Sequence, residues 1–180
     1  MSNHQSSNPG NIGKAILDHV EKLLGIDEKW LVATDKSITW WPAAFAQRIR
    51  VSEPIDDDGI EITQVSIETD LCFVDELSEK ATAMLSATAM MSTLSGVIHE
   101  KGAPGKLKLA SKVYVHEDNI PWTSGMISWA CSLQAEETHR LAKELAIIID
   151  GEVATSQHPD SGLRSEPDEM LSIVEGLVVP

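Results

Sequence analysis

Histidine and carboxylate side chains that could do chemistry are few in this sequence. The chain has six histidines, His4, His19, His99, His116, His139 and His158. No two of them show the HxH, HxxxH or HExxH spacing of a zinc site. His99 and His116, each followed by a glutamate, are the pair that could meet in a pocket as acid–base groups. We expect no metal and no cofactor from these residues.

An acidic turn, Asp56-Asp57-Asp58-Gly59, is the other candidate site. Its carboxylate oxygens could hold a hard cation. The twelve-residue ligand spacing of an EF-hand is absent, however, and Asp-Gly between two alternating runs is typical of a β-hairpin turn. We therefore expect a solvated hairpin turn here.

The two cysteines, Cys72 and Cys131, lie far apart within apolar surroundings. His139 follows Cys131 by eight residues on one predicted helix, about 12 Å along its axis, which is too far for a thiolate–imidazole pair. Two scattered cysteines in a chain of this size are typical of a cytoplasmic protein with buried free thiols.

The charge of the chain excludes several classes of partner. It has 180 residues, with 28 acidic and 14 basic side chains and a formal net charge of −14. Nucleic acids and anionic membrane surfaces both require clustered Lys and Arg, so we expect neither as a partner. The polar N-terminal residues also lack the apolar segment of a signal peptide.

Tryptophan is unusually frequent, with five residues against two Phe and one Tyr. Trp40 and Trp41 are adjacent in a predicted extended segment, so their indoles should point to opposite faces. We expect one of them to face the core, and the other is a candidate binding residue at an exposed edge. The alternative is that both serve only core or edge packing. Trp122 and Trp129 are seven residues apart on a predicted helix and are expected in its core-facing stripe.

Periodicity and turn signals predict the order of the elements. A helix over 11–24, ended by Gly25, precedes an extended segment over 31–42 and a hairpin that turns at 57–59. The apolar alternation slips at Gln64 and Val65, which predicts a β-bulge. A helix from Asp75 to Ile98, a strand over 106–116 and a helix over 120–149 follow.

This order favours an α+β fold, with the N-terminal helix first and a small antiparallel sheet of three to five strands packed against two long helices. We expect residues 1–10 to be disordered, residues 11–155 to form one domain, and residues 156–180 to form a polar linker and a short C-terminal helix.

The stretch 81–98 has eighteen residues without a charge, and six of them are Ser or Thr. This is too polar for membrane insertion, yet a surface helix of an acidic protein should carry charges. We therefore expect most of the helix to be covered, by this chain or by a second copy. Its predicted packing or dimer face consists of Met84, Ala87, Met91, Leu94 and Ile98.

The element order, the acidity, the hairpin over 45–70 and the helix DELSEKATAMLSATAMMSTLSGVIHE together resemble the type III secretion chaperone-like domain, which is shared with YbjN-like bacterial proteins. Members of this family usually have a hairpin where one strand, 106–116, is predicted here. The resemblance implies a homodimer that binds another protein or a peptide without catalysis. The alternative is a small-ligand-binding domain or enzyme with a pocket between sheet and helices.

Overall fold

A computed structural model of the chain describes residues 11–79, 81–83 and 95–163. These ranges hold two helices with described bounds, eight strands and further helical residues at 79 and 81–83, in an α+β arrangement that begins with a helix. The helices are α1 (Asn11–Leu24) and α3 (Ile120–Ile149). The strands are β1 (Leu31–Thr34), β2 (Ser37–Trp40), β3 (Gln47–Val51), β4 (Ile55–Asp57), β5 (Ile60–Phe73), β6 (Gly96–Glu100), β7 (Lys106–Val115) and β8 (Glu152–Val153). Two 3-10 turns, η1 (Glu28–Trp30) and η2 (Glu117–Asn119), precede β1 and α3.

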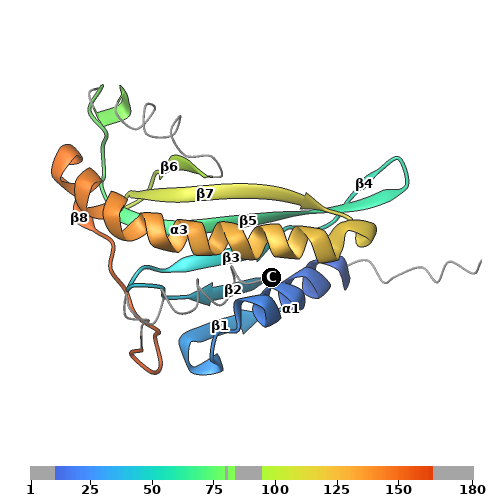
Figure 1. The fold of residues 1–180 in the computed structure, drawn as a ribbon. Helices are drawn as coiled ribbons and strands as arrows, with labels where there is room; N and C mark the ends of the chain where they lie inside the picture. The colour runs from blue at the N-terminus through green and yellow to red at the C-terminus, as the bar shows by residue number, and fades with distance from the viewer. Residues whose placement is uncertain (1–10, 80, 84–94, 164–180) are drawn as a thin grey trace, which may run out of the picture.

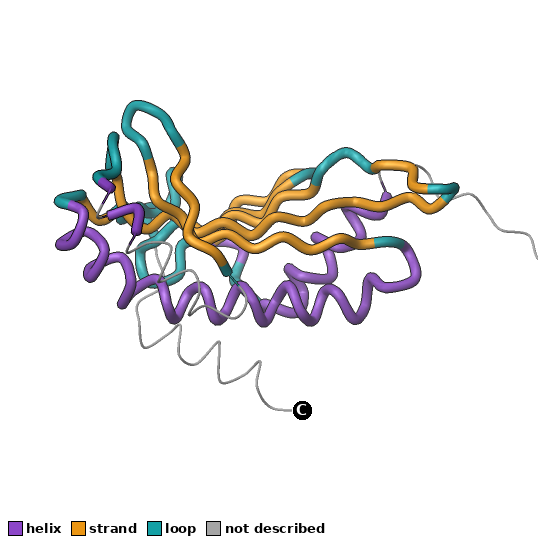
Figure 2. Tube along the Cα trace, turned by 90° about the horizontal axis from the view of Figure 1, so that it is seen from above, coloured by secondary structure: helices purple, strands orange, loops and turns teal. Residues whose placement is uncertain are grey.

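The strands form one antiparallel sheet in the order β1-β2-β3-β5-β7-β6. β4 and β8 each pair with β5 outside this path, at its two ends. β5 is the central strand because its fourteen residues pair with β3 and β4 along one edge and with β7 along the other. α1 and α3 lie side by side on one face of the sheet (Figures 1 and 2). Arg48, Glu68 and Lys108 point to the opposite face.

The sheet is larger than the three to five strands expected from the sequence. The segment 31–40 forms a hairpin, β1–β2, that turns at Asp35 and Lys36, where a single extended segment was expected. The expected hairpin at 57–59 is confirmed as β4–β5, with Asp58 and Gly59 at φ +53° and +84° as this type of turn requires.

The expected helix from Asp75 to Ile98 is wrong at both ends. Residues 75–78 are not helical, and the described helical residues begin at Glu79, with Ser78 Oγ accepting from the Ala81 backbone N–H at 3.2 Å. Gly96–Glu100 forms strand β6, in which Ile98 pairs with Lys108 and its side chain is exposed. Gly96 disfavours a helix, and the β-branched pair Val97 and Ile98 favours a strand. Met84, Ala87, Met91 and Leu94, the rest of the predicted packing face, lie outside the described residues.

The expected bulge at Gln64 is also wrong, because β5 pairs regularly with β7 from Thr63 to Asp70 and shifts register only between Asp70 and Cys72. The alternation slips for another reason. Val65 and Ile67 point toward the helices, whereas Ile60 and Ile62 lie on the opposite face, where β5 runs past the helices into the projecting β4–β5 hairpin (Figure 1).

Part of the predicted C-terminal linker packs against the body. β8 pairs with the end of β5, and the backbone N–H of Ser156 donates to the carbonyl of Ala44. His158 is buried, with its Nε2 3.3 Å from the carbonyl oxygen of Leu31 and its Nδ1 accepting from the backbone N–H groups of Asp160 and Ser161. This arrangement fixes residues 152–161 to the sheet.

Candidate functional site

A chain of buried hydrogen bonds crosses the interior beneath α3. The indole Nε1 of Trp40 on β2 donates to Gln47 Oε1 on β3 at 2.7 Å. The Gln47 amide in turn donates to Thr69 Oγ1 on β5 at 2.9 Å and to the backbone carbonyl of Cys131 at 3.0 Å. Trp40 is therefore held in the core by a specific polar partner.

The same chain continues from the sheet to the helix. Thr69 Oγ1 donates to Gln134 Oε1 at 2.8 Å, and the Gln134 amide donates to Ser95 at 3.0 Å and to Ser111 at 2.9 Å. All of these side chains are buried. The chain separates two hydrophobic clusters, one around α1 and the first half of α3 and the other around the second half of α3. It thus ties four strands and connecting segments to one side of α3.

Both tryptophans expected at a binding edge are buried. Trp40 is 1% exposed and Trp41 is 7% exposed. Trp41 follows the end of β2, so the strand alternation that would send it to the opposite face no longer applies. Its indole packs edge-on against the buried His158 ring, with centroids 5.2 Å apart. Neither side chain therefore provides the exposed contact that the sequence predicted.

The exposed aromatic residues lie instead on the outward side of α3. Trp122, Met126 and Trp129 are 69%, 39% and 53% exposed. Their spacing of four and three residues puts them on one stripe, which the half-buried Leu133 extends by another four. We call these four residues the α3 stripe. The expectation that Trp122 and Trp129 pack in the core is wrong.

The sheet-facing side of α3 explains this reversal. It carries small and polar side chains, among them Ser124, Ser128 and Ser132, and each serine donates to the carbonyl four residues earlier. Short side chains that satisfy their own hydroxyl groups let the helix backbone lie close to the sheet. The large apolar side chains of the first half of α3 are consequently left on the surface.

A second exposed apolar patch lies on the β4–β5 hairpin, where Ile55, Ile60 and nearby Tyr114 of β7 are all exposed. The acidic residues of the turn lie beside them. Asp56 Oδ1 accepts a hydrogen bond from the Gly59 backbone N–H at 3.0 Å, as expected for a hairpin turn. In the described part of the chain, no three His, Cys, Asp or Glu side chains are placed to hold a metal ion.

Six charged side chains form ion pairs on the face of the sheet that points away from α1 and α3. Asp70 is nearly buried and accepts two hydrogen bonds from Arg48 Nη1, at 3.0 and 3.1 Å, and one from Lys106 at 3.1 Å. Lys108, also buried, lies between Glu68 at 3.1 Å and Glu100 at 2.6 Å. Within this group, three cations are matched by three carboxylates.

The pKa shifts of Lys108 and Glu100 follow from their ion pair. Desolvation lowers the pKa of Lys108, but the hydrogen bonds to Glu100 and Glu68 outweigh it and leave the pKa raised. The hydrogen bond from Lys108 lowers the pKa of Glu100. Both groups are consequently held in their charged forms at neutral pH.

The two histidines considered for chemistry do not meet. His99 on β6 pairs with Leu107, and its Nε2 lies 3.2 Å from the carbonyl oxygen of Val74. His116 follows β7 at its other end, nine residues beyond Leu107 and roughly 30 Å away along the strand. Cys72 and Cys131 are buried free thiols, and burial raises the pKa of Cys72 to about 11 and that of Cys131 still further.

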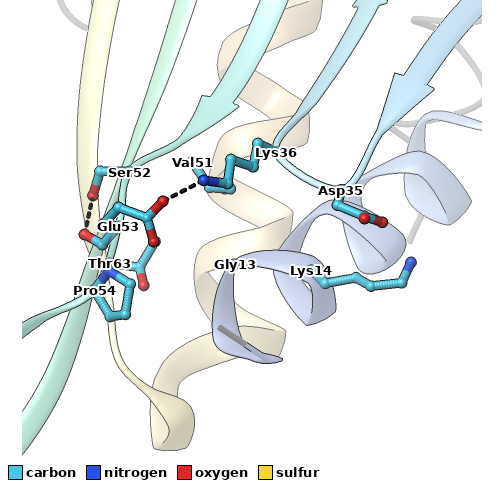
Figure 3. Close-up of a pocket in the computed structure, with 9 residues that line it drawn as sticks. All are labelled: Gly13, Lys14, Asp35, Lys36, Val51, Ser52, Glu53, Pro54 and Thr63. Atoms are coloured by element: carbon cyan, nitrogen blue, oxygen red, sulfur yellow. Dashed lines mark hydrogen bonds and ion pairs between the residues drawn. The ribbon is translucent and has the colours of Figure 1, made fainter. Parts of the chain in front are cut away.

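A pocket of about 270 Å³ opens between the first turn of α1, the β1–β2 turn and the β3–β4 connection (Figure 3). An ion pair between Lys36 and Glu53 lies along it, and Thr63 and Val51 form part of its wall. Neither a histidine nor a cysteine is among the described residues that line it. The pocket therefore contains none of the groups that the sequence suggested for catalysis.

Comparison with known proteins gives no relative for this chain. No protein-family model, curated protein or solved structure matches it. No helix among the described residues is long and apolar enough to span a membrane.

Proposed function

We propose that this chain is a non-catalytic, homodimeric domain that binds another protein or a peptide, in the manner of a secretion chaperone. The observation that carries the proposal is the α3 stripe. Two tryptophans and a methionine are displayed on a helix of thirty residues, and the buried polar chain holds this helix against the sheet. Large exposed aromatic residues on a rigid element are typical of protein interfaces.

The distribution of the other groups supports a binding role over catalysis. His99 and His116 are at opposite ends of β7, and both thiols are buried. On the sheet face away from α1 and α3, Asp70 is paired with Arg48 and Lys106, and Lys108 is paired with Glu68 and Glu100. A catalytic site needs several such groups directed at one reacting atom.

The order of elements also supports the resemblance to secretion chaperones. α1 comes first, followed by the strands up to β5 and then by the segment that contains residues 81–98. β6 and β7 form a hairpin before α3, where the sequence predicted one strand and the resemblance implies two. The free buried cysteines are in keeping with a cytoplasmic location.

Photo-cross-linking tests the binding role directly. A photo-reactive phenylalanine analogue in place of Met126 should give covalent adducts when cells of the protein's own host are irradiated. The same analogue in place of Arg140, on the charged half of the same helix, serves as the control. We expect adducts with a protein, either a second copy of this chain or a different one, at position 126 and few adducts at position 140. Equal labelling at both positions, or none at 126, would contradict the proposal.

A further inference from the structure

The α3 stripe repeats every four, three and four residues, from Trp122 through Met126 and Trp129 to Leu133. This is the spacing with which one helix packs along another. Gly125 lies beside the stripe, and a methyl group added there would meet no atom within 4 Å. The space beside the centre of the stripe is therefore open, and the lack of a side chain at Gly125 would let another backbone come close there.

The distribution of charge along α3 indicates which helix packs on the stripe. No residue from 120 to 135 is charged, although the chain has a net charge of −14. Acidic and basic residues begin at Glu136 and continue through Arg140 to Glu144. A second copy of this acidic chain would be repelled at most of its surface, but it can approach an uncharged stripe without that cost.

We infer that Trp122, Met126 and Trp129 of the α3 stripe bind the same three residues of a second copy, with the two helices antiparallel about a two-fold axis beside Gly125 and Met126. Trp122 of each copy then lies against Trp129 of the other. This inference rests on the proposed function and specifies its homodimer interface. A two-fold contact of this kind uses the same surface on both copies and closes the assembly at two chains.

The antiparallel direction follows from the charged half of α3. With the axis near Met126, the residues from Glu136 onward extend away from the partner helix in opposite directions. A parallel pair would instead place Glu136 and Glu144 of one copy beside the same residues of the other, and like charges at such positions repel.

The size of the stripe predicts the strength of the association. Four partly exposed indoles, two methionines and their neighbours would bury on the order of 1,000 Å², close to the lower limit for a specific interface. The dimer should accordingly dissociate in a concentration range that sedimentation can follow, with a Kd on the order of micromolar.

Sedimentation velocity over a dilution series tests the interface. The native chain should change from dimer to monomer, whereas Met126→Glu should raise the Kd at least about 30-fold, because symmetry places two carboxylates in the contact. Ile147→Glu, at a residue 84% exposed on the same helix beyond the stripe, should behave as the native chain. Circular dichroism establishes that both variants are folded.

The outcomes separate this inference from the proposed function. A native dimer that Met126→Glu leaves intact would overturn the α3 interface but retain a homodimer through another surface. A native chain that is monomeric at every concentration would overturn both the interface and the homodimer. Photo-adducts at position 126 that contain a different protein would overturn the second copy as occupant while supporting the binding role.

Cysteine cross-linking tests the direction of the pair. Gly125→Cys, beside the two-fold axis, should form an intermolecular disulfide under mild oxidation, because both native cysteines are buried. Glu136→Cys should remain unlinked in the antiparallel arrangement. A disulfide with Glu136→Cys as strong as that with Gly125→Cys would contradict the antiparallel pair.

Discussion

Thr69 of β5 donates its hydroxyl hydrogen to the side-chain oxygen of Gln134 on α3, at 2.8 Å and out of contact with solvent. This bond is one of those that join the sheet to the helix, together with the bond from Gln47 to the Cys131 carbonyl and that from Gln134 to Ser111. These bonds fix the position of α3 over the sheet and its rotation about its own axis. They therefore determine which side of the helix faces outward.

Replacing Gln134 with Leu should lower the free energy of unfolding by about 3 kcal/mol, because the buried hydroxyl groups of Thr69, Ser95 and Ser111 each lose one of their hydrogen bonds. Chemical denaturation measures this change. Glu136→Gln, at an exposed position two residues further along, should leave the unfolding free energy nearly the same. Equal stability of Gln134→Leu and the native chain would show that the polar chain does not hold the helix.

A second prediction concerns the ion pairs that Asp70 forms with Arg48 and Lys106. Asp70→Asn should destabilise the fold by about 2 kcal/mol, because Arg48 and Lys106 then lose the carboxylate they share in a largely desolvated position. Both cations are about a quarter exposed, which keeps the loss below that of a fully buried pair. Lys14→Gln, which breaks only the surface pair with Asp18, should have little effect on the denaturation midpoint.

The dependence of stability on pH should include a contribution from Glu100. Its pKa is lowered in the folded chain, so its stabilising effect is present above the unfolded pKa near 4.5 and is lost as pH falls through the lower folded value. Glu100→Gln should therefore flatten the acid limb of melting temperature against pH. An acid limb as steep as that of the native chain would rule out this contribution.

Thiol reactivity tests the burial of the cysteines. Because burial raises the pKa of Cys72 to about 11, only about one molecule in a thousand has the thiolate at pH 8. Neither native cysteine should react with iodoacetamide in the folded protein at that pH, and both should react in denaturant. Ile147→Cys supplies an exposed thiol as a positive control, and fast labelling of the folded native chain would contradict the buried positions.

Local signals predicted the local elements well. The four-residue spacing of Ile12, Ile16, Val20 and Leu24 gave α1, and Asp58-Gly59 gave the hairpin. β6 was missed because its five residues follow a long uncharged stretch that continues a helical pattern. Only the pairing with β7 across the turn at 101–105 decides between helix and strand there.

The candidate surface depended on which side of α3 faces the sheet, and the sequence offered two apolar choices. The larger side chains, Trp122, Met126 and Trp129, suggested the wrong one. The signal that could have corrected this is the series Ser124, Ser128 and Ser132 with Gln134. These short or polar side chains form the face of α3 that packs closely against the sheet and its buried polar groups. Recognising it requires the partner residues Gln47 and Thr69, which lie more than sixty residues away in the chain.

The most direct test of the account is acrylamide quenching of tryptophan fluorescence at high protein concentration, comparing the native chain with Met126→Glu. If the α3 stripe is covered by a second copy, Met126→Glu should be quenched more strongly, because Trp122 and Trp129 become accessible while Trp40 and Trp41 stay buried. The same comparison in a Trp122→Phe, Trp129→Phe background should show no difference. Equal quenching of the native chain and Met126→Glu would contradict the claim that the α3 stripe is a covered protein contact.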